Sequence, residues 1–200
     1  MKFIIADYNP EWIDRFNAEQ KTIAEALKNF TPSIDHIGST SVPGLGAKNI
    51  IDILVGLNNE GDLDKIVEPM LNANAGYIYY QLYEDQMPYR RYFVKVEAFD
   101  PSKNLEISKI VESQEDRPPL EDFKRLTHIH CITKNTHHWM RHIAFRDYLR
   151  THPDIRYEYC ELKKEISKRH YRDMLDYNDA KDSWVKETEQ KAIEWYEGNN

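Results

Sequence analysis

The strongest constraint on the fold is an apolar run interrupted by a single acid, Ile50 to Val55. Its β-branched residues are typical of a strand buried on both faces of a sheet. An unpaired carboxylate within such a strand would be strongly destabilising. We therefore expect Asp52 to lie near a strand end or to have a partner, such as a metal ion or Lys48. This makes Asp52 the first candidate for a functional residue.

A segment rich in glycine and serine precedes this strand. We expect strands over 34–37 and 50–56, joined by a turn that begins Gly38-Ser39-Thr40. Small side chains, hydroxyl groups and backbone N–H groups in such a turn can bind phosphate. Spacing alone favours a simpler explanation, in which glycine shapes the turn and Ser39 or Thr40 caps a short helix. Neither a P-loop nor a dinucleotide-binding glycine motif is present.

The rest of the chain alternates between helical and strand patterns. Periodicity predicts helices over 10–30, 61–74, 136–150, 153–170 and from 178 or 179 onward, and strands over 77–83, 89–96 and 126–132. Asn9 is the expected cap of the first helix, Thr136 that of the first C-terminal helix, and 77–83 should pair with 89–96 as an antiparallel hairpin. The segment 97–125 is predicted to be a long loop or insertion, either a lid or a tolerated surface element.

These elements predict one domain over 1–200 of the α/β (α+β) class. A mixed sheet of about five strands should be flanked by an N-terminal helix and a helical C-terminal part over 136–200. Two histidines, His128 and His130, should share one face of their strand. Arg90 and Arg91 are neighbours in another strand, so only one of them should face a cleft.

Composition narrows the possible partners and location. The formal net charge of −7 argues against broad binding to nucleic acids. No apolar run is long enough to span a membrane, and the N-terminus becomes polar too soon for a signal peptide. Cys131 and Cys160 lack the spacing of metal ligands. We expect a soluble, cytoplasmic protein with no membrane partner; its oligomeric state is left open.

The chain resembles a known family in three places. These are GSTSVPGLGAKNIIDILV at 38–55, His-Ile-His at 128–130, and AFRDYLR at 144–150. They resemble the GrpB family, and the resemblance covers nearly the whole chain. The order strand, Gly-Ser, short connection, strand with an acid is similar to the opening of the nucleotidyltransferase superfamily of the DNA polymerase β type. The resemblance implies a nucleotidyltransferase-like core.

The resemblance also implies roles for particular residues. Asp52 would hold Mg²⁺ and act in catalysis together with His130. The residues implied to contact the substrate or its phosphates are Gly38, Ser39, Thr40, Lys48, Arg90 or Arg91, His128 and Arg146. The ligand would be a nucleotide or a small phosphorylated molecule. Arg146 has a simpler alternative role in a surface ion pair with Asp147.

One departure from the superfamily pattern leaves the activity open. The second strand of that pattern carries two acids two residues apart, whereas this chain has Asp52 and Leu54. Another carboxylate could complete the site, His130 could replace the third acid, or the domain could bind its ligand without catalysis. The candidate carboxylates are Asp35, Glu84, Asp85 and Glu97.

Three functional hypotheses follow. The first is Mg²⁺-dependent transfer of a nucleotidyl group from a nucleoside triphosphate to a small acceptor. The alternative is a non-catalytic module that binds a nucleotide or phosphate ligand and acts on a protein partner. The third is a transition-metal hydrolase built on His36, His128 and His130, which ranks last because the chain has no HExxH spacing.

Overall fold

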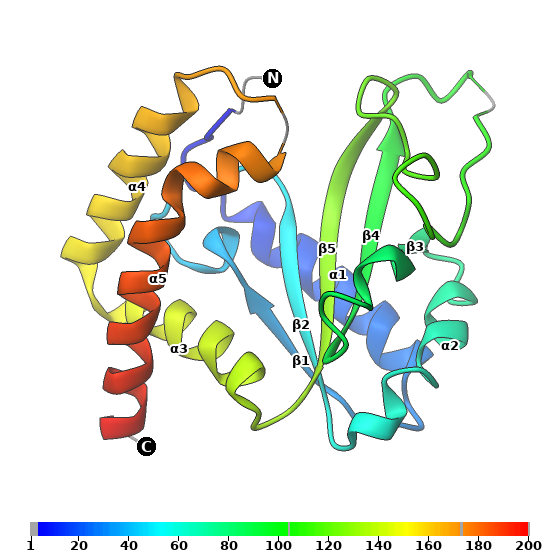
Figure 1. Cartoon of the computed structure of the whole chain (residues 1–200), viewed down its shortest axis with the longest axis horizontal. Coiled ribbons are helices and arrows are strands. Elements are labelled where there is room, and N and C mark those ends of the chain that lie inside the picture. Colours follow the sequence, from blue (N-terminus) through cyan, green and yellow to red (C-terminus); the bar gives the residue numbers. More distant parts are fainter. Residues whose placement is uncertain (1–3, 104, 173, 200) are drawn as a thin grey trace.

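The protein is organised around a mixed five-stranded sheet, as the sequence predicts (Figure 1). The computed structural model describes residues 4–103, 105–172 and 174–199. The strands are β1 (Ser33–Ile37), β2 (Ile51–Leu57), β3 (Tyr77–Tyr79), β4 (Arg90–Ala98) and β5 (Phe123–Thr133). They lie in the order β1-β2-β5-β4-β3. Only the β2–β5 pair is parallel, and the other pairs are antiparallel.

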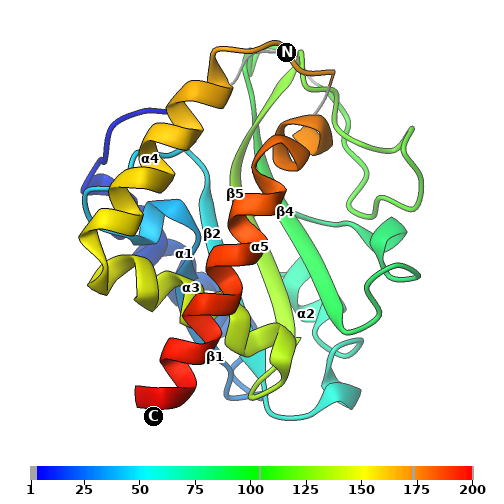
Figure 2. The same cartoon turned by 60° about the vertical axis from the view of Figure 1, so that its left-hand side comes forward.

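The part of the chain that the structure describes forms five α-helices around the sheet. They are α1 (Glu11–Ala26), α2 (Val67–Leu71), α3 (His137–Thr151), α4 (Pro153–Ser167) and α5 (Met174–Asn199). The helices α1 and α2 pack on one face, while Ile143 of α3 packs with Leu54 and Ile132 on the other. In Figure 2, α5 passes in front of the sheet, between α4 and β4. No described helix is both long and apolar enough to cross a lipid bilayer.

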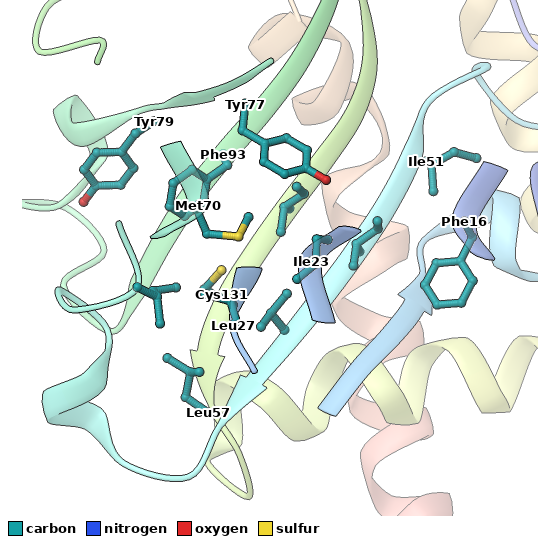
Figure 3. Packing of buried hydrophobic residues seen from close by; sticks show 14 of the residues in the cluster. Phe16, Ile23, Leu27, Ile51, Leu57, Met70, Tyr77, Tyr79, Phe93 and Cys131 are labelled. Carbon is teal, nitrogen blue, oxygen red and sulfur yellow. The ribbon is translucent and has the colours of Figure 1, made fainter. Parts of the chain in front are cut away.

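The main core lies between the sheet and α1. Ile51, Ile53 and Val55 alternate along β2 and point to this face, where they meet Trp12 and Ile23. Figure 3 shows Ile23 of α1 and Leu27, which directly follows this helix, among side chains from several strands. The intervening residues of β2, which include Asp52, face the opposite side of the sheet. Strand periodicity therefore separates the packing face from the face that carries polar groups.

The contribution of α1 to this core can be tested with two isoleucines of the same helix. Ile23 is fully buried, whereas Ile13 is 44% exposed. We expect Ile23→Ala to lower the free energy of unfolding by about 2–5 kcal/mol, because it removes apolar contacts and leaves a cavity. Ile13→Ala should cost well under half as much. Urea denaturation measures both, and equal losses would contradict the packing described here.

Several predicted boundaries are wrong. Helix α1 ends at Ala26 and is followed by a turn, rather than continuing to residue 30. The helix predicted over 61–74 is reduced to α2, with a separate 3₁₀ turn at Glu60–Asp62. The strand predicted over 77–83 ends at Tyr79, after which Gln81–Tyr83 forms another 3₁₀ turn. In each case the regular backbone is shorter than the apolar pattern. The antiparallel hairpin of β3 and β4 is confirmed.

The connections around the later elements also differ in detail. The segment predicted as 97–125 is a connection over 99–122, because β4 and β5 each extend into it. It is anchored, since Val111 is buried and its N–H donates to the carbonyl of Tyr79. Helix α5 already begins at Met174, before the predicted Asn178 or Asp179. The Thr136 side chain caps α3 as predicted, by accepting a hydrogen bond from the N–H of Trp139.

The start of α1 also differs slightly from the prediction. The capping position is occupied by Pro10 rather than Asn9, and the helix begins at Glu11. Asn9 still serves the first turn, because its Oδ1 accepts a hydrogen bond of 2.9 Å from the N–H of Glu11. Asn9 therefore stabilises the start of α1 as predicted, but from the position before the cap.

Candidate functional site

A cavity of about 540 Å³ lies on the face of the sheet opposite α1. Strand pairing places polar side chains next to one another on this face. Asp52 of β2 lies beside His128 of β5, and His130 lies beside Tyr92 of β4. All four side chains line the cavity. The prediction that His128 and His130 share one face of their strand is confirmed, and the pairing of β2 with β5 places Asp52 on the same face.

Asp52 and His128 form a hydrogen-bonded pair. The His128 Nδ1–H donates to Asp52 Oδ1 over 3.2 Å. In a neutral imidazole, this hydrogen bond leaves the lone pair on Nε2. The Nε2 atom is buried and has no hydrogen-bond partner among the residues that the structure describes. Asp52 was expected to lie near a strand end or to have a partner; it is the second residue of β2, and its hydrogen-bond partner is the imidazole of His128.

His130 is held as a neutral imidazole. Burial lowers its pKa well below the usual value, and the nearby guanidinium of Arg90 lowers it further. Arg90 Nη1 donates to His130 Nδ1 over 3.2 Å. Arg90 also covers the ring of Tyr92, with 4.9 Å between its Cζ and the ring centroid. His130 is therefore an uncharged imidazole that accepts a hydrogen bond from Arg90.

The turn that begins at Gly38 forms one wall. Gly38 has a φ of +67°, and Ser39–Ser41 forms a 3₁₀ turn. A Cβ atom at Gly38 would overlap the Asp52 carboxylate, so only glycine fits here. Ser39 and Thr40 both line the cavity. The Thr40 hydroxyl is already engaged, with 3.0 Å between its Oγ1 and His36 Nε2.

Lys163 of α4 is a functional candidate that the sequence reasoning missed. Its side chain is almost fully buried, at 3% exposed. Its Nζ donates to the carbonyl of Gly46 and to Ser39 Oγ, the latter over 3.0 Å. Burial lowers its pKa to about 7, and the positive charges of Lys181 and Lys48 add to this effect. The one sequence feature that could have indicated its burial is its position on the same helix face as the apolar residues Tyr159 and Ile166.

Lys48 and Lys181 complete a group of lysines. Burial, followed by repulsion from Lys181, lowers the pKa of Lys48 to about 8. The ring of Tyr177 lies against both amines, with 4.5 Å from Lys48 Nζ and 5.7 Å from Lys181 Nζ to the ring centroid. Lys48 was predicted from the sequence, whereas Lys181 was not. Its position on α5 becomes meaningful only when that helix packs across the sheet.

The charge of the cavity wall is strongly unbalanced. Its cationic residues are Lys48, Arg90, Arg117, Arg125, Lys163 and Lys181, six in all. Among the described residues, Asp52 is the only acid in the lining. This concentration of positive charge occurs in a chain whose net charge is −7. The arrangement is suited to an anionic ligand.

Two predicted site residues lie elsewhere. Arg91 points to the opposite face of the sheet, where its Nε donates to Asp64 over 2.8 Å. Arg146 donates to Asp147 over 2.7 Å and to Asp35 over 3.1 Å, away from the cavity lining. The ion-pair alternative for Arg146 therefore describes its contacts. Of the two neighbouring arginines, Arg90 is the one that faces the cavity.

No second carboxylate accompanies Asp52 in the cavity lining of the described residues. Asp35 is paired with Arg146, Glu97 with Lys124, and Glu84 accepts from the Tyr79 hydroxyl. Asp85 does not line the cavity.

The described residues also contain no group of three or more His, Cys, Asp and Glu side chains placed to bind a metal ion. The hydrolase hypothesis requires His36, His128 and His130 to converge with an acid at metal-ligand distance. This hypothesis is therefore wrong.

The fold and the cavity together define a mixed α/β protein with a cation-lined cavity on one face of its sheet. The model of the family described as GrpB protein matches residues 2–191. The chain belongs to the GrpB family.

Several known proteins are similar to this chain over most of its length. The crystal structure of conserved protein GrpB from Enterococcus faecalis is 32% identical, covers 96% of this chain and 99% of that one, and superimposes with a TM-score of 0.74. UPF0157 protein YqkA from Bacillus subtilis is 32% identical over 96% of this chain, which spans about half (48%) of that relative's length. A dephospho-CoA kinase of Mycobacterium leprae is 26% identical over 81% of this chain and 39% of its own length.

Proposed function

We propose that the cavity binds a nucleotide or another small phosphorylated ligand. The observation that carries this proposal is the set of six cationic side chains set against one carboxylate in the cavity wall. Gathering positive charges around a single carboxylate is unfavourable, and burial together with repulsion from Lys181 lowers the pKa of both Lys48 and Lys163. A bound phosphate would neutralise these groups and accept charge-assisted hydrogen bonds.

The dimensions and the remaining wall favour a small molecule. A volume of about 540 Å³ lies in the range typical of ligand pockets. Tyr83, Tyr92 and Tyr177 line the same space and offer aromatic surface to a base or sugar. The net charge of −7 disfavours a long polyanion such as duplex DNA. The 26% identity to a dephospho-CoA kinase is a reason to include adenine nucleotides and dephospho-CoA among the ligands tested.

Mg²⁺-dependent nucleotidyl transfer is a second candidate, favoured by the position of Asp52. Its carboxylate lies among the cations and against Gly38, beside the turn that the resemblance to the nucleotidyltransferase superfamily assigns to phosphate. Mg²⁺ is commonly bound by one or two carboxylates together with the phosphates of the substrate. Asp52 fits one Mg²⁺ that arrives with a nucleotide. A pair of metals held by several protein carboxylates does not fit the described residues.

The test of ligand binding compares two lysines of the same helix. Lys181 lines the cavity, whereas Lys186 is exposed and paired with Asp182. The wild-type protein is first screened by thermal shift against nucleoside triphosphates and diphosphates, dephospho-CoA and sugar phosphates, with and without Mg²⁺. For a ligand that raises the melting temperature, we expect Lys181→Gln to weaken binding about tenfold in calorimetry, and Lys186→Gln to leave it unchanged. Binding by none of the phosphates, or equal losses in both variants, would refute the proposal.

The role of metal is tested separately with Asp52→Asn. If Asp52 holds Mg²⁺, this variant should lose the Mg²⁺-dependent part of the binding and retain the metal-independent part. Metal-dependent binding that survives in Asp52→Asn would remove Asp52 from the metal site. Release of pyrophosphate from a triphosphate in the presence of an acceptor then distinguishes nucleotidyl transfer from binding alone.

A further inference from the structure

The cations of the cavity fall into two groups on different parts of the fold. Lys48, Lys163 and Lys181 come from the entry to β2 and from α4 and α5. The arginines come from β4, the 99–122 connection and β5, and they are Arg90, Arg117 and Arg125. Strand β5 lies between β2 and β4 in the sheet. Because neighbouring strands are about 4.8 Å apart, β2, which follows Lys48, and β4, which begins with Arg90, are about 10 Å apart across the sheet.

The arginine group surrounds a cluster of tyrosine rings. Arg117 donates to the Tyr83 hydroxyl over 2.6 Å, and Arg90 lies over Tyr92. Arg125 Cζ is 5.7 Å from the centroid of the Tyr80 ring. The rings themselves are in contact, with centroids 6.1 Å apart for Tyr80 and Tyr83 and 5.9 Å apart for Tyr83 and Tyr92. At this end of the cavity, each arginine is therefore held in place against a tyrosine ring.

The arginine group also lacks counter-charges. Within residues 4–103, 105–172 and 174–199, no carboxylate forms an ion pair with Arg90, Arg117 or Arg125. The Nε atoms of Arg90 and Arg117 are buried and have no hydrogen-bond partner in the same residues. Buried donors of this kind normally have an acceptor, and a guanidinium is matched to the paired oxygens of a phosphate or carboxylate.

We infer that the ligand carries oxyanionic groups at two ends, one bound by the lysines and one by the arginines. This rests on the proposed function and names the class of ligand, a small molecule with two separated phosphates or a phosphate and a carboxylate. A nucleoside bisphosphate and a sugar bisphosphate both belong to this class. A ligand with a single phosphate satisfies only one group and leaves the other charges uncompensated.

The test uses matched probes that differ by one phosphate. Calorimetry compares 5′-AMP with adenosine 3′,5′-bisphosphate, and fructose 6-phosphate with fructose 1,6-bisphosphate. We expect the bisphosphate of at least one pair to bind at least about tenfold more tightly than its monophosphate. Arg117→Gln should remove most of this gain while leaving the affinity for the monophosphate nearly unchanged. Lys109→Gln, an exposed residue of the same connection, should change neither affinity.

The outcomes separate the two proposals. Equal affinities within both pairs, or an Arg117→Gln variant that weakens monophosphate and bisphosphate alike, would overturn the two-ended ligand and leave phosphate binding intact. Failure of these probes and of every other phosphate compound to bind would overturn the proposed function itself. Thermal unfolding of Arg117→Gln without ligand establishes that the variant is folded before its affinities are compared.

Discussion

Replacing Gly38 with alanine should both destabilise the protein and abolish ligand binding. Gly38 has a φ of +67°, and an added Cβ atom would lie 2.9 Å from Asp52 Cβ and overlap its carboxylate. Asp52 and the Gly38–Ser41 turn cannot both keep their positions in the variant. We expect a loss of about 2–4 kcal/mol in the free energy of unfolding, from backbone strain together with the overlap. Chemical denaturation and calorimetry measure the two effects.

Gly76 provides the matched control for this substitution. It has a similar φ of +72°, but nothing lies within 4 Å of the position that a Cβ would take. Gly76→Ala therefore introduces the backbone strain without the overlap, and we expect a loss of about 1–2 kcal/mol with normal ligand binding. If Gly76→Ala were as damaging as Gly38→Ala, the effect at Gly38 would come from the backbone alone.

Binding of a phosphate ligand should take up protons above pH 7. Burial lowers the pKa of Lys163 to about 7 in the ligand-free protein, so this amine loses its proton at alkaline pH. A bound phosphate favours the charged form and raises that pKa. Between the two pKa values the complex therefore holds a proton that the free protein lacks. Affinity should fall by up to about tenfold per pH unit for each proton taken up.

Calorimetry in two buffers of different ionisation enthalpy measures the number of protons taken up. Lys163→Met should reduce it, whereas Lys164→Met, at an exposed neighbouring position, should not. The same lowered pKa affects folding. The unfolded chain keeps the Lys163 proton to about pH 10.5, whereas the folded protein loses it at about pH 7. The free energy of unfolding of the ligand-free protein should therefore rise between about pH 7 and 10.5. Proton release on binding, or uptake unchanged in Lys163→Met, would contradict this account.

Local patterns were sufficient to predict the strands and the shared face of His128 and His130. Alternation along β2 and β5 places Asp52, His128 and His130 together once the two strands are neighbours. The same alternation explains why Arg90 and Arg91 face opposite sides of β4, but not which of them faces the cavity. That choice depends on which residues of β5 lie opposite them, which is a property of strand pairing. Periodicity also overestimated the predicted helix at 61–74, because the apolar spacing continues on both sides of the regular helix α2, which contains Pro69.

The cations supplied by later segments could not be predicted in the same way. Lys163 and Lys181 lie on helices whose charged residues resemble any solvated surface, and Arg117 lies in a long connection. Their role depends on where α4, α5 and the 99–122 connection pack, and packing between distant segments leaves little trace in local spacing. The burial of Lys163 among Tyr159 and Ile166 is the one case in which an apolar stripe interrupted by a lysine carried a usable signal.

The hydrogen bond between Lys163 and Ser39 joins residues separated by 124 positions in the chain. During synthesis, the turn that contains Ser39 is complete long before α4 and α5 have been made. The cavity therefore exists only after the last helices have emerged and docked on the sheet. A ligand that contacts both sides stabilises this docking by mass action, so occupancy of the cavity marks a chain whose folding is finished.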